Sequence, residues 1–108
     1  MREPLFEHRL ELGGRTTRAL ELEGEGPPLV LVHGYADSAD TWRMVLEHCA
    51  RVGRRAIAID LPGYGEADRL RDGPVLPQYD ELVGELVERV ADEAGEPVVL
   101  AGNSLGGV

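Results

Sequence analysis

The chain has 108 residues, a length that forms one domain at most, with a modest core. Its composition, 43% hydrophobic and 29% charged, is typical of a folded globular protein and excludes a disordered chain. The formal net charge of -9 argues against nucleic acid and anionic membranes as partners, because phosphate binding needs clustered cations.

The cysteine count and the pattern of apolar residues limit the kinds of site and the cellular location that we expect. Cys49 is the only cysteine, which excludes an intramolecular disulfide and a cysteine-based metal site. Residues 1–12 contain no apolar run of signal-peptide length, and no stretch of about 18 apolar residues indicates a membrane span. We therefore expect a cytoplasmic protein. Ligands at metal-site spacing are absent, so we expect no metal and no cofactor.

Two strands, 5–12 and 15–23, are the first elements that the sequence predicts. Between them lies Gly13-Gly14, a dipeptide suited to a tight hairpin turn. Side chains alternate along 17–22, which predicts a strand with one solvated face.

A strand–helix–strand unit follows. Residues 29–32 form a continuous apolar run, as expected for a parallel strand covered on both faces. Asp40 is a plausible N-cap of the next helix, and Gly53 is expected to end it. Apolar residues recur at helical spacing between them, at Trp42, Val45, Leu46 and Cys49. Residues 56–59 then predict a second buried strand.

A long loop over 61–77, rich in glycine and proline, precedes the next helix. That helix is predicted over 79–94 and ends at Gly95. One apolar stripe runs along it, made by Leu82, Val83, Leu86, Val87, Val90 and Ala94. Residues 97–101 predict a third buried strand. The alternation of strands and helices predicts an α/β fold with a mostly parallel sheet of about five strands and two helices.

The strongest chemical signal is residues 102–106 (GNSLG), directly after the third apolar strand. A serine hydroxyl is a poor nucleophile unless it is held out of the sheet, beside a base and near oxyanion donors. A sharp strand-to-helix turn exposes Ser104 in this way, and Gly102 and Gly106 let the strand and the coming helix approach closely. The pentapeptide alone is suggestive and does not decide the function.

A second motif supports the first. The apolar run 29–32 leads straight into His33-Gly34-Tyr35. In a hydrolase of this architecture the oxyanion needs two backbone amides from different loops. Leu105, which follows the nucleophile, supplies one of them, and Tyr35 is the best candidate for the other.

Three segments together resemble the α/β-hydrolase superfamily: 33–42, 60–65 and 102–107. Within it they are most similar to the branch of esterases, C–C bond hydrolases and haloperoxidase-like enzymes. The resemblance implies a three-layer fold, with 1–108 as the N-terminal part of the domain, strands one to five of an eight-stranded sheet. In this family the nucleophile precedes the catalytic acid and histidine. Neither has a counterpart in this sequence, so we expect a missing C-terminal half or a partner chain to complete the sheet and the site.

The remaining motif residues receive supporting roles. We expect His33 to hold the oxyanion loop by hydrogen bonds, and the resemblance implies that Asp60 organises the turn after its strand. Gly102 and Gly106 shape the elbow. The substrate-binding surface is assigned to Gly34, Tyr35 and Asn103.

The leading hypothesis is a serine hydrolase of ester, amide or related carbonyl substrates, carboxylesterase-like as the complete protein. Ser104 argues against a dehalogenase or an epoxide hydrolase, which would need aspartate at that position. The alternative is a non-catalytic small-molecule binding or receptor module on the same fold. A dinucleotide-binding domain fails, because the glycines do not reproduce the Gly-x-Gly-x-x-Gly order.

The third apolar strand raises the question of stability. By family resemblance residues 98–101 lie in the sheet interior, so a chain ending at Val108 would leave an apolar edge. We therefore expect the 108-residue chain alone to be poorly stable and inactive.

Overall fold

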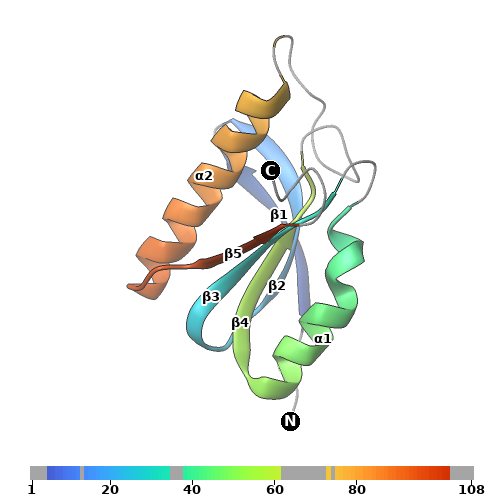
Figure 1. Ribbon diagram of the computed structural model, residues 1–108, viewed down its shortest axis with the longest axis vertical. Coiled ribbons are helices and arrows are strands. Elements are labelled where there is room, and N and C mark those ends of the chain that lie inside the picture. Colours follow the sequence, from blue (N-terminus) through green and yellow to red (C-terminus); the bar gives the residue numbers. More distant parts are fainter. Residues whose placement is uncertain (1–4, 13, 35–37, 62–72, 74, 103–108) are drawn as a thin grey trace.

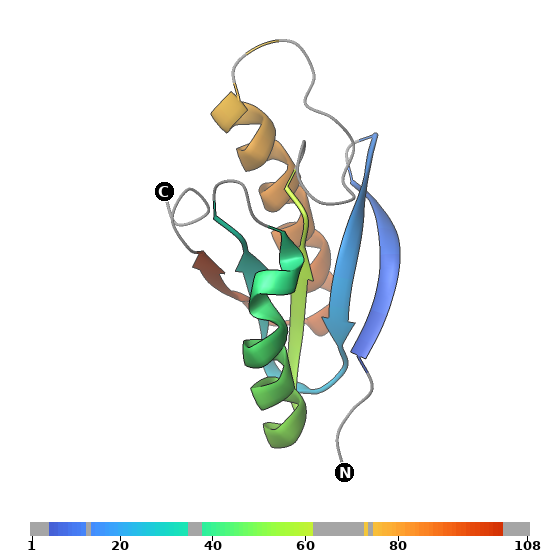
Figure 2. The same ribbon diagram turned by 90° about the vertical axis from the view of Figure 1, so that its right-hand side faces the viewer.

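A computed structural model of the chain describes 5–12, 14–34, 38–61, 73 and 75–102. The fold has three layers, a twisted five-stranded sheet with helices α1 and α2 on opposite faces (Figures 1 and 2). None of the described helices is long and apolar enough to cross a membrane.

The first two strands form the predicted hairpin. Strand β1 spans Leu5–Leu12 and pairs antiparallel with β2, Arg15–Leu22, in a register that sets Leu12 opposite Arg15. Gly14 in the turn has φ 77°, a value that glycine adopts without strain. The predicted solvated face of β2 is wrong. Side chains on both faces are buried, because β2 lies between β1 and a third strand and its second face contributes to the core under α2.

The unit that follows begins with strand β3, Glu25–Val32, and a 3-10 turn η1, Ala39–Trp42. Helix α1, Arg43–Val52, continues from η1. The prediction that Asp40 is the N-cap is wrong, because Ser38 accepts the capping hydrogen bond from the Asp40 amide.

Gly53 ends α1 as predicted. It has φ 72°, in the left-handed region, and its N–H bonds back to the carbonyl groups of the last turn. Cys49 is buried on the inner face of this helix, beside Leu46 and Ala50 in an apolar cluster. Strand β4, Arg54–Ile59, follows and contains the predicted buried run.

Helix α2 spans Val75–Ala94 and therefore starts four residues before the predicted Tyr79. Pro77 does not prevent this, because a proline in the first helical turn removes no intrahelical hydrogen bond. The predicted apolar stripe faces the sheet, where its fully buried members are Leu82, Leu86 and Val90.

Strand β5 spans Val99–Gly102, a short strand at the edge of the sheet. The prediction of a buried strand is wrong for the described chain, since Val99 and Leu100 are 44% and 53% exposed. Among the described strands only β3 pairs with β5, so the other side of β5 is an unpaired edge of the described sheet.

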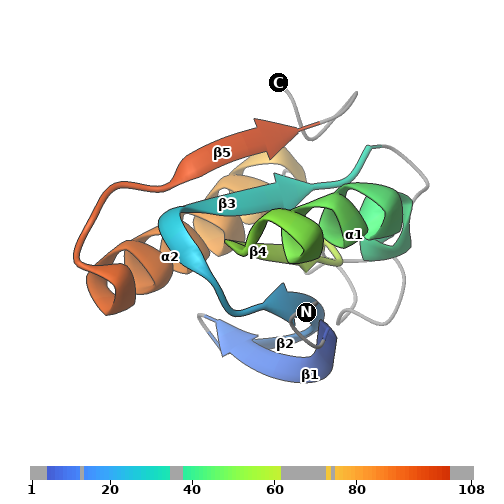
Figure 3. The same ribbon diagram turned by 90° about the horizontal axis from the view of Figure 1, so that it is seen from below.

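The strand order is β1-β2-β4-β3-β5 (Figure 3). Strand β3 is parallel to both of its neighbours, whereas β2 is antiparallel to β1 and to β4. The predicted fold class is therefore confirmed, with a mixed sheet. Two apolar clusters form the core. Val30 and Val32 face α2, and Leu31 faces α1 from the other side of the same strand.

Candidate active site

The carboxyl ends of the three parallel strands meet at one edge of the sheet (Figure 2). Val32, the last residue of β3, pairs with Ile59 of β4 on one side and with Gly102 of β5 on the other. His33 and Asp60 follow these strand ends directly. Ligands of open α/β sheets bind outside the carboxyl ends of the strands, so this edge is the candidate site.

His33 is fully buried and joins the chain segments that leave β3 and β4. The backbone N–H of Leu61 donates to His33 Nε2 over 2.8 Å. Because Nε2 accepts this bond, the ring proton lies on Nδ1, which donates to the carbonyl oxygen of Gly34 at 2.7 Å. The imidazole thus holds the start of the loop after β3 against the segment after β4.

Asp60 is also fully buried, and it is the centre of an ion-pair network. Arg18 of β2 donates from Nε to Asp60 Oδ2 over 3.0 Å and from Nη2 to Oδ1 over 3.4 Å. The backbone N–H of Ala39 donates to Oδ1 over 2.7 Å. The Thr17 hydroxyl donates to the Asp60 carbonyl oxygen. The carboxylate is therefore both charge-balanced and hydrogen-bonded, which a buried charge requires.

The outer part of the Arg18 guanidinium binds two exposed carboxylates. Nη2 lies 2.9 Å from Asp40 Oδ2, and Nη1 lies 3.3 Å from Glu7 Oε1. Arg43 adds a second cation, 2.8 Å from Asp40 Oδ1. The hydrogen bond from Arg18, assisted by Arg43, lowers the pKa of Asp40, and the hydrogen bond to Asp40 raises the pKa of Arg18.

Part of the site predicted from the sequence lies outside the described residues, namely Tyr35, Asn103, Ser104, Leu105 and Gly106. The other predicted positions are described. His33, Gly34 and Asp60 lie together at the strand ends, and Gly102 ends β5 level with Val32. The turn that Asp60 is expected to organise lies outside the described residues. Instead, its side chain binds β2 and the start of η1.

Arg18 is the residue that sequence reasoning missed. Its side chain is 9% exposed, and it links β2 to the segment after β4. A signal was present, because Arg18 shares a strand face with Leu20 and Leu22, which are buried. An arginine in register with buried leucines needs an anionic partner, although the sequence does not say which one.

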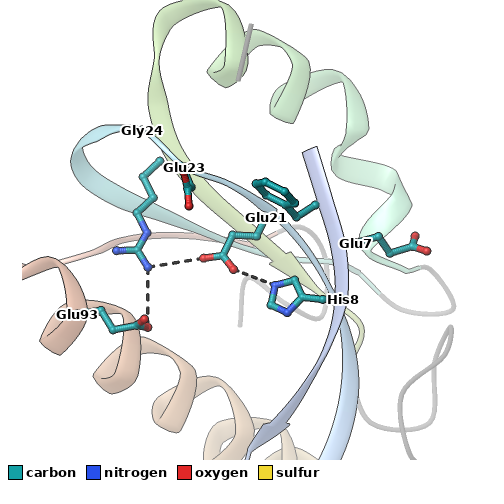
Figure 4. Close-up of a pocket in the computed structure, with 8 residues that line it drawn as sticks. Glu7, His8, Glu21, Glu23, Gly24 and Glu93 are labelled. Carbon is teal, nitrogen blue, oxygen red and sulfur yellow. Dashed lines mark hydrogen bonds and ion pairs between the residues drawn. The ribbon is translucent and has the colours of Figure 1, made fainter. Parts of the chain in front are cut away.

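A separate cavity of about 790 Å³ lies between the β1–β2 hairpin and the C-terminal half of α2 (Figure 4). Glu21 lies between His8 and Arg55, with contacts of 2.9 Å and 3.6 Å, and Arg55 also contacts Glu93 at 3.8 Å. Gly24 lines the same cavity, near the amino end of β4. Since Asp60 lies at the opposite end of that strand, we assign this cavity no part in the candidate active site.

A metal-based site finds no support in the described part of the chain. There, no three or more His, Cys, Asp or Glu side chains are grouped so that they could hold a metal ion.

Known proteins resemble this chain over nearly its whole length. A family model described as "Alpha/beta hydrolase family" matches 29–108. The chain is 40% identical over 101 residues to the dihydrolipoyllysine-residue acetyltransferase component of the acetoin cleaving system of Pseudomonas putida, which covers 92% of the chain and 26% of that protein. It is 35% identical over 100 residues to protein phosphatase methylesterase 1 of Bos taurus, an alignment that covers 90% of this chain and 26% of that protein.

Solved structures show the same fold. An epoxide hydrolase from Vigna radiata superposes with a TM-score of 0.81 at 24% sequence identity, over 94% of this chain and 32% of that one. At this identity the likeness shows the fold alone. The chain spans about a quarter of the length of the curated relatives named above.

Proposed function

The chain belongs to the α/β-hydrolase family, and from this premise we propose that the protein carrying it is a serine hydrolase of ester, amide or related carbonyl substrates. Ser104 is the nucleophile of this proposal. The backbone amides of Tyr35 and Leu105 stabilise the oxyanion that forms when the serine attacks a carbonyl carbon. Gly34 and Asn103 border the substrate.

One observation carries the proposal. Strand β5 ends at Gly102, which pairs with Val32, and Ser104 follows Gly102 by only two residues. Two residues reach at most about 7 Å, and this short connection supports a nucleophile close to the strand end that leads into His33 and Gly34. The two motifs that supply nucleophile and oxyanion amides therefore leave neighbouring strands at one edge of the sheet.

The structure also bears on the general base. His33 is the one histidine at this edge among the described residues, and its Nε2 already accepts the Leu61 N–H. A ring nitrogen that accepts a backbone bond is not available to take the proton from a serine hydroxyl. We therefore propose that His33 supports the loop, and that the acid and histidine of the triad come from a further segment or a partner chain. By the same argument the 108-residue chain alone is inactive.

The names of two relatives support carbonyl chemistry for this proposal, whereas two others are named an epoxide hydrolase and a haloalkane dehalogenase, chemistries that would need aspartate where this chain has Ser104. Of the first two, one is named a methylesterase and the other an acetyltransferase component. Both names describe transfer of an acyl group from a donor to an acceptor, which for an esterase is water. A serine nucleophile suits this step because its acyl ester is readily hydrolysed. The proposal is carboxylesterase-like on this ground. A cytoplasmic location remains a prediction, and fractionation of the source cells tests it.

Fluorophosphonate labelling tests the proposed function. The natural protein should be labelled at Ser104, as located by peptide mass spectrometry, and should hydrolyse p-nitrophenyl acetate. Ser104→Ala should remove the label and lower kcat by about 10⁶-fold. A Ser104→Ala protein that keeps its activity would refute the proposal. A wild-type protein that binds small molecules without any turnover would favour a non-catalytic binding module. Robust labelling of the isolated 108-residue chain would contradict its expected inactivity.

A further inference from the structure

The loop between β3 and η1 is anchored at both ends by two consecutive residues of another segment. At its start, His33 Nε2 accepts the N–H of Leu61 over 2.8 Å. At its end, the N–H of Ala39 donates to Asp60 Oδ1 over 2.7 Å. Because Asp60 and Leu61 are adjacent, one short segment binds both His33, which follows β3, and Ala39, which begins η1.

The Ala39 anchor depends on a carboxylate that has no solvent around it. Asp60 is 0% exposed, and Arg18 binds both of its oxygens, at 3.0 Å and 3.4 Å. Two parallel N–H donors from a planar guanidinium fix the orientation of a carboxylate as well as balancing its charge. Without Arg18 the Asp60 carboxylate would lose the cation that binds both of its oxygens, and its orientation would no longer be fixed.

We propose that Arg18 is a positioning residue for the oxyanion hole. The inference rests on the proposed function, in which the Tyr35 amide is one of the two oxyanion donors. In the chain Tyr35 lies between His33 and Ala39, the two anchored positions. Arg18 does not reach this amide itself; it acts through Asp60. A shift of about 1 Å in a catalytic group is enough to lower a rate by about 100-fold, so the anchoring matters for turnover.

The guanidinium shape is needed for this role. Arg18 holds Asp60 with Nε and Asp40 with Nη2, and Asp40 lies in η1, directly after the anchored Ala39. One side chain therefore connects the buried carboxylate and the far end of the loop. A lysine would keep the charge but supply one compact ammonium, which cannot hold two carboxylates in this fixed geometry.

Kinetics of the natural protein with p-nitrophenyl acetate test the inference. We expect Arg18→Lys to lower kcat by about 10- to 100-fold, while KM stays within about two-fold, because the oxyanion forms only after the ester binds. Arg43→Met is the matched control. Arg43 also contacts Asp40, at 2.8 Å, but its side chain is half-exposed and lies outside the buried pair of Arg18 and Asp60. This control should change kcat by less than about two-fold.

The fold of each variant is checked by thermal unfolding. Arg18→Met leaves Asp60 without its cation and is a harsher variant. If it does not fold, Arg18→Lys decides the outcome. A folded Arg18→Lys protein with wild-type kcat, or with a raised KM and an unchanged kcat, would overturn the proposal. The same loss of kcat in the Arg43→Met control would overturn it too.

Amide exchange separates this inference from the proposed function. The Ala39 N–H bonds to a buried carboxylate and should exchange slowly in wild type and faster in Arg18→Lys. Unchanged protection of Ala39 would show that Arg18 does not fix the loop. If turnover does not depend on Ser104, the proposed function fails and the assignment to an oxyanion hole fails with it. The exchange result then still shows whether Arg18 anchors the loop.

Discussion

Replacing Asp60 by asparagine removes the central charge of the buried network and leaves its shape nearly unchanged. The Arg18 guanidinium, with a side chain 9% exposed, then still contacts the carboxylates of Asp40 and Glu7, whose side chains are 47% and 54% exposed. Asparagine has one acceptor oxygen and one NH2 donor group in place of two acceptor oxygens. It therefore cannot accept all the N–H bonds that Arg18 and Ala39 donate to Asp60.

The expected loss of stability follows from removing one charge of the Arg18–Asp60 ion pair while the other carboxylates stay in place. Removing one partner of a buried ion pair costs about 3 to 5 kcal/mol when the other charge is left without compensation. Because two exposed carboxylates still bind Arg18, we expect Asp60→Asn to lower the free energy of unfolding by about 2 to 4 kcal/mol. Complete single domains have a total stability of about 5 to 15 kcal/mol, so an effect of this size is large.

Urea unfolding followed by the fluorescence of Trp42 measures the change. Trp42 is the only tryptophan and packs against the apolar cluster under α1, so its emission reports on the folded core. Asp92→Asn is the control, since Asp92 is exposed on α2 and its neutralisation should change stability by about 0.5 kcal/mol or less. Where the 108-residue chain alone is too unstable, the measurement uses the natural protein and follows its unfolding by far-UV circular dichroism.

Two results would refute the reasoning. The first is a loss of less than about 1 kcal/mol for Asp60→Asn. The second concerns the double variant Arg18→Met with Asp60→Leu. Since it removes both charges together, it should be more stable than the sum of the single losses implies. Strictly additive losses would mean that Arg18 and Asp60 do not stabilise one another.

Two further predictions concern acid sensitivity and glycine packing. The pKa of Asp40 is lowered by Arg18 and Arg43, so the ionised carboxylate stabilises the fold fully above the ordinary pKa of 3.8. This stabilisation is lost as the pH falls through the pKa of the folded state. Asp40→Asn should therefore lower Tm at pH 7, and the difference in Tm from wild type should shrink below about pH 4. A Cβ at Gly24 would lie 2.5 Å from backbone atoms of Gly53 and of the first two residues of β4, whereas Gly84 in α2 has open space around it. Gly24→Ala should therefore lower the free energy of unfolding by about 1 to 3 kcal/mol, and Gly84→Ala should raise it by about 1 kcal/mol. Urea titration measures both changes. Equal changes in the two variants would contradict the packing argument.

Local sequence patterns are sufficient for most of the elements. The hairpin forms around a glycine turn, and α1 ends at Gly53 because a left-handed residue closes a helix most easily as glycine. Both signals act within a few residues, so they do not depend on the rest of the fold. The same holds for the apolar runs of β3 and β4, which continuous burial requires.

Element boundaries depend on competition that the local pattern does not contain. Asp40 is as good a capping residue as Ser38 on propensity alone. In the structure its carboxylate binds Arg18 and Arg43, and the Ser38 hydroxyl accepts the Asp40 amide in the first turn of η1. The helix start therefore depends on an arginine from a distant strand.

The candidate site divides in the same way. The sequence by itself determines that GNSLG follows one apolar strand and His33-Gly34-Tyr35 another, and those motifs carry the proposed chemistry. Only the tertiary structure decides that the two strands are neighbours in the order β4-β3-β5, and that Arg18 meets Asp60, 42 residues away. The physical reason is that a strand pattern specifies which face is buried but not which strand lies beside it. The partner of a buried charge is therefore fixed by the order and register of the sheet.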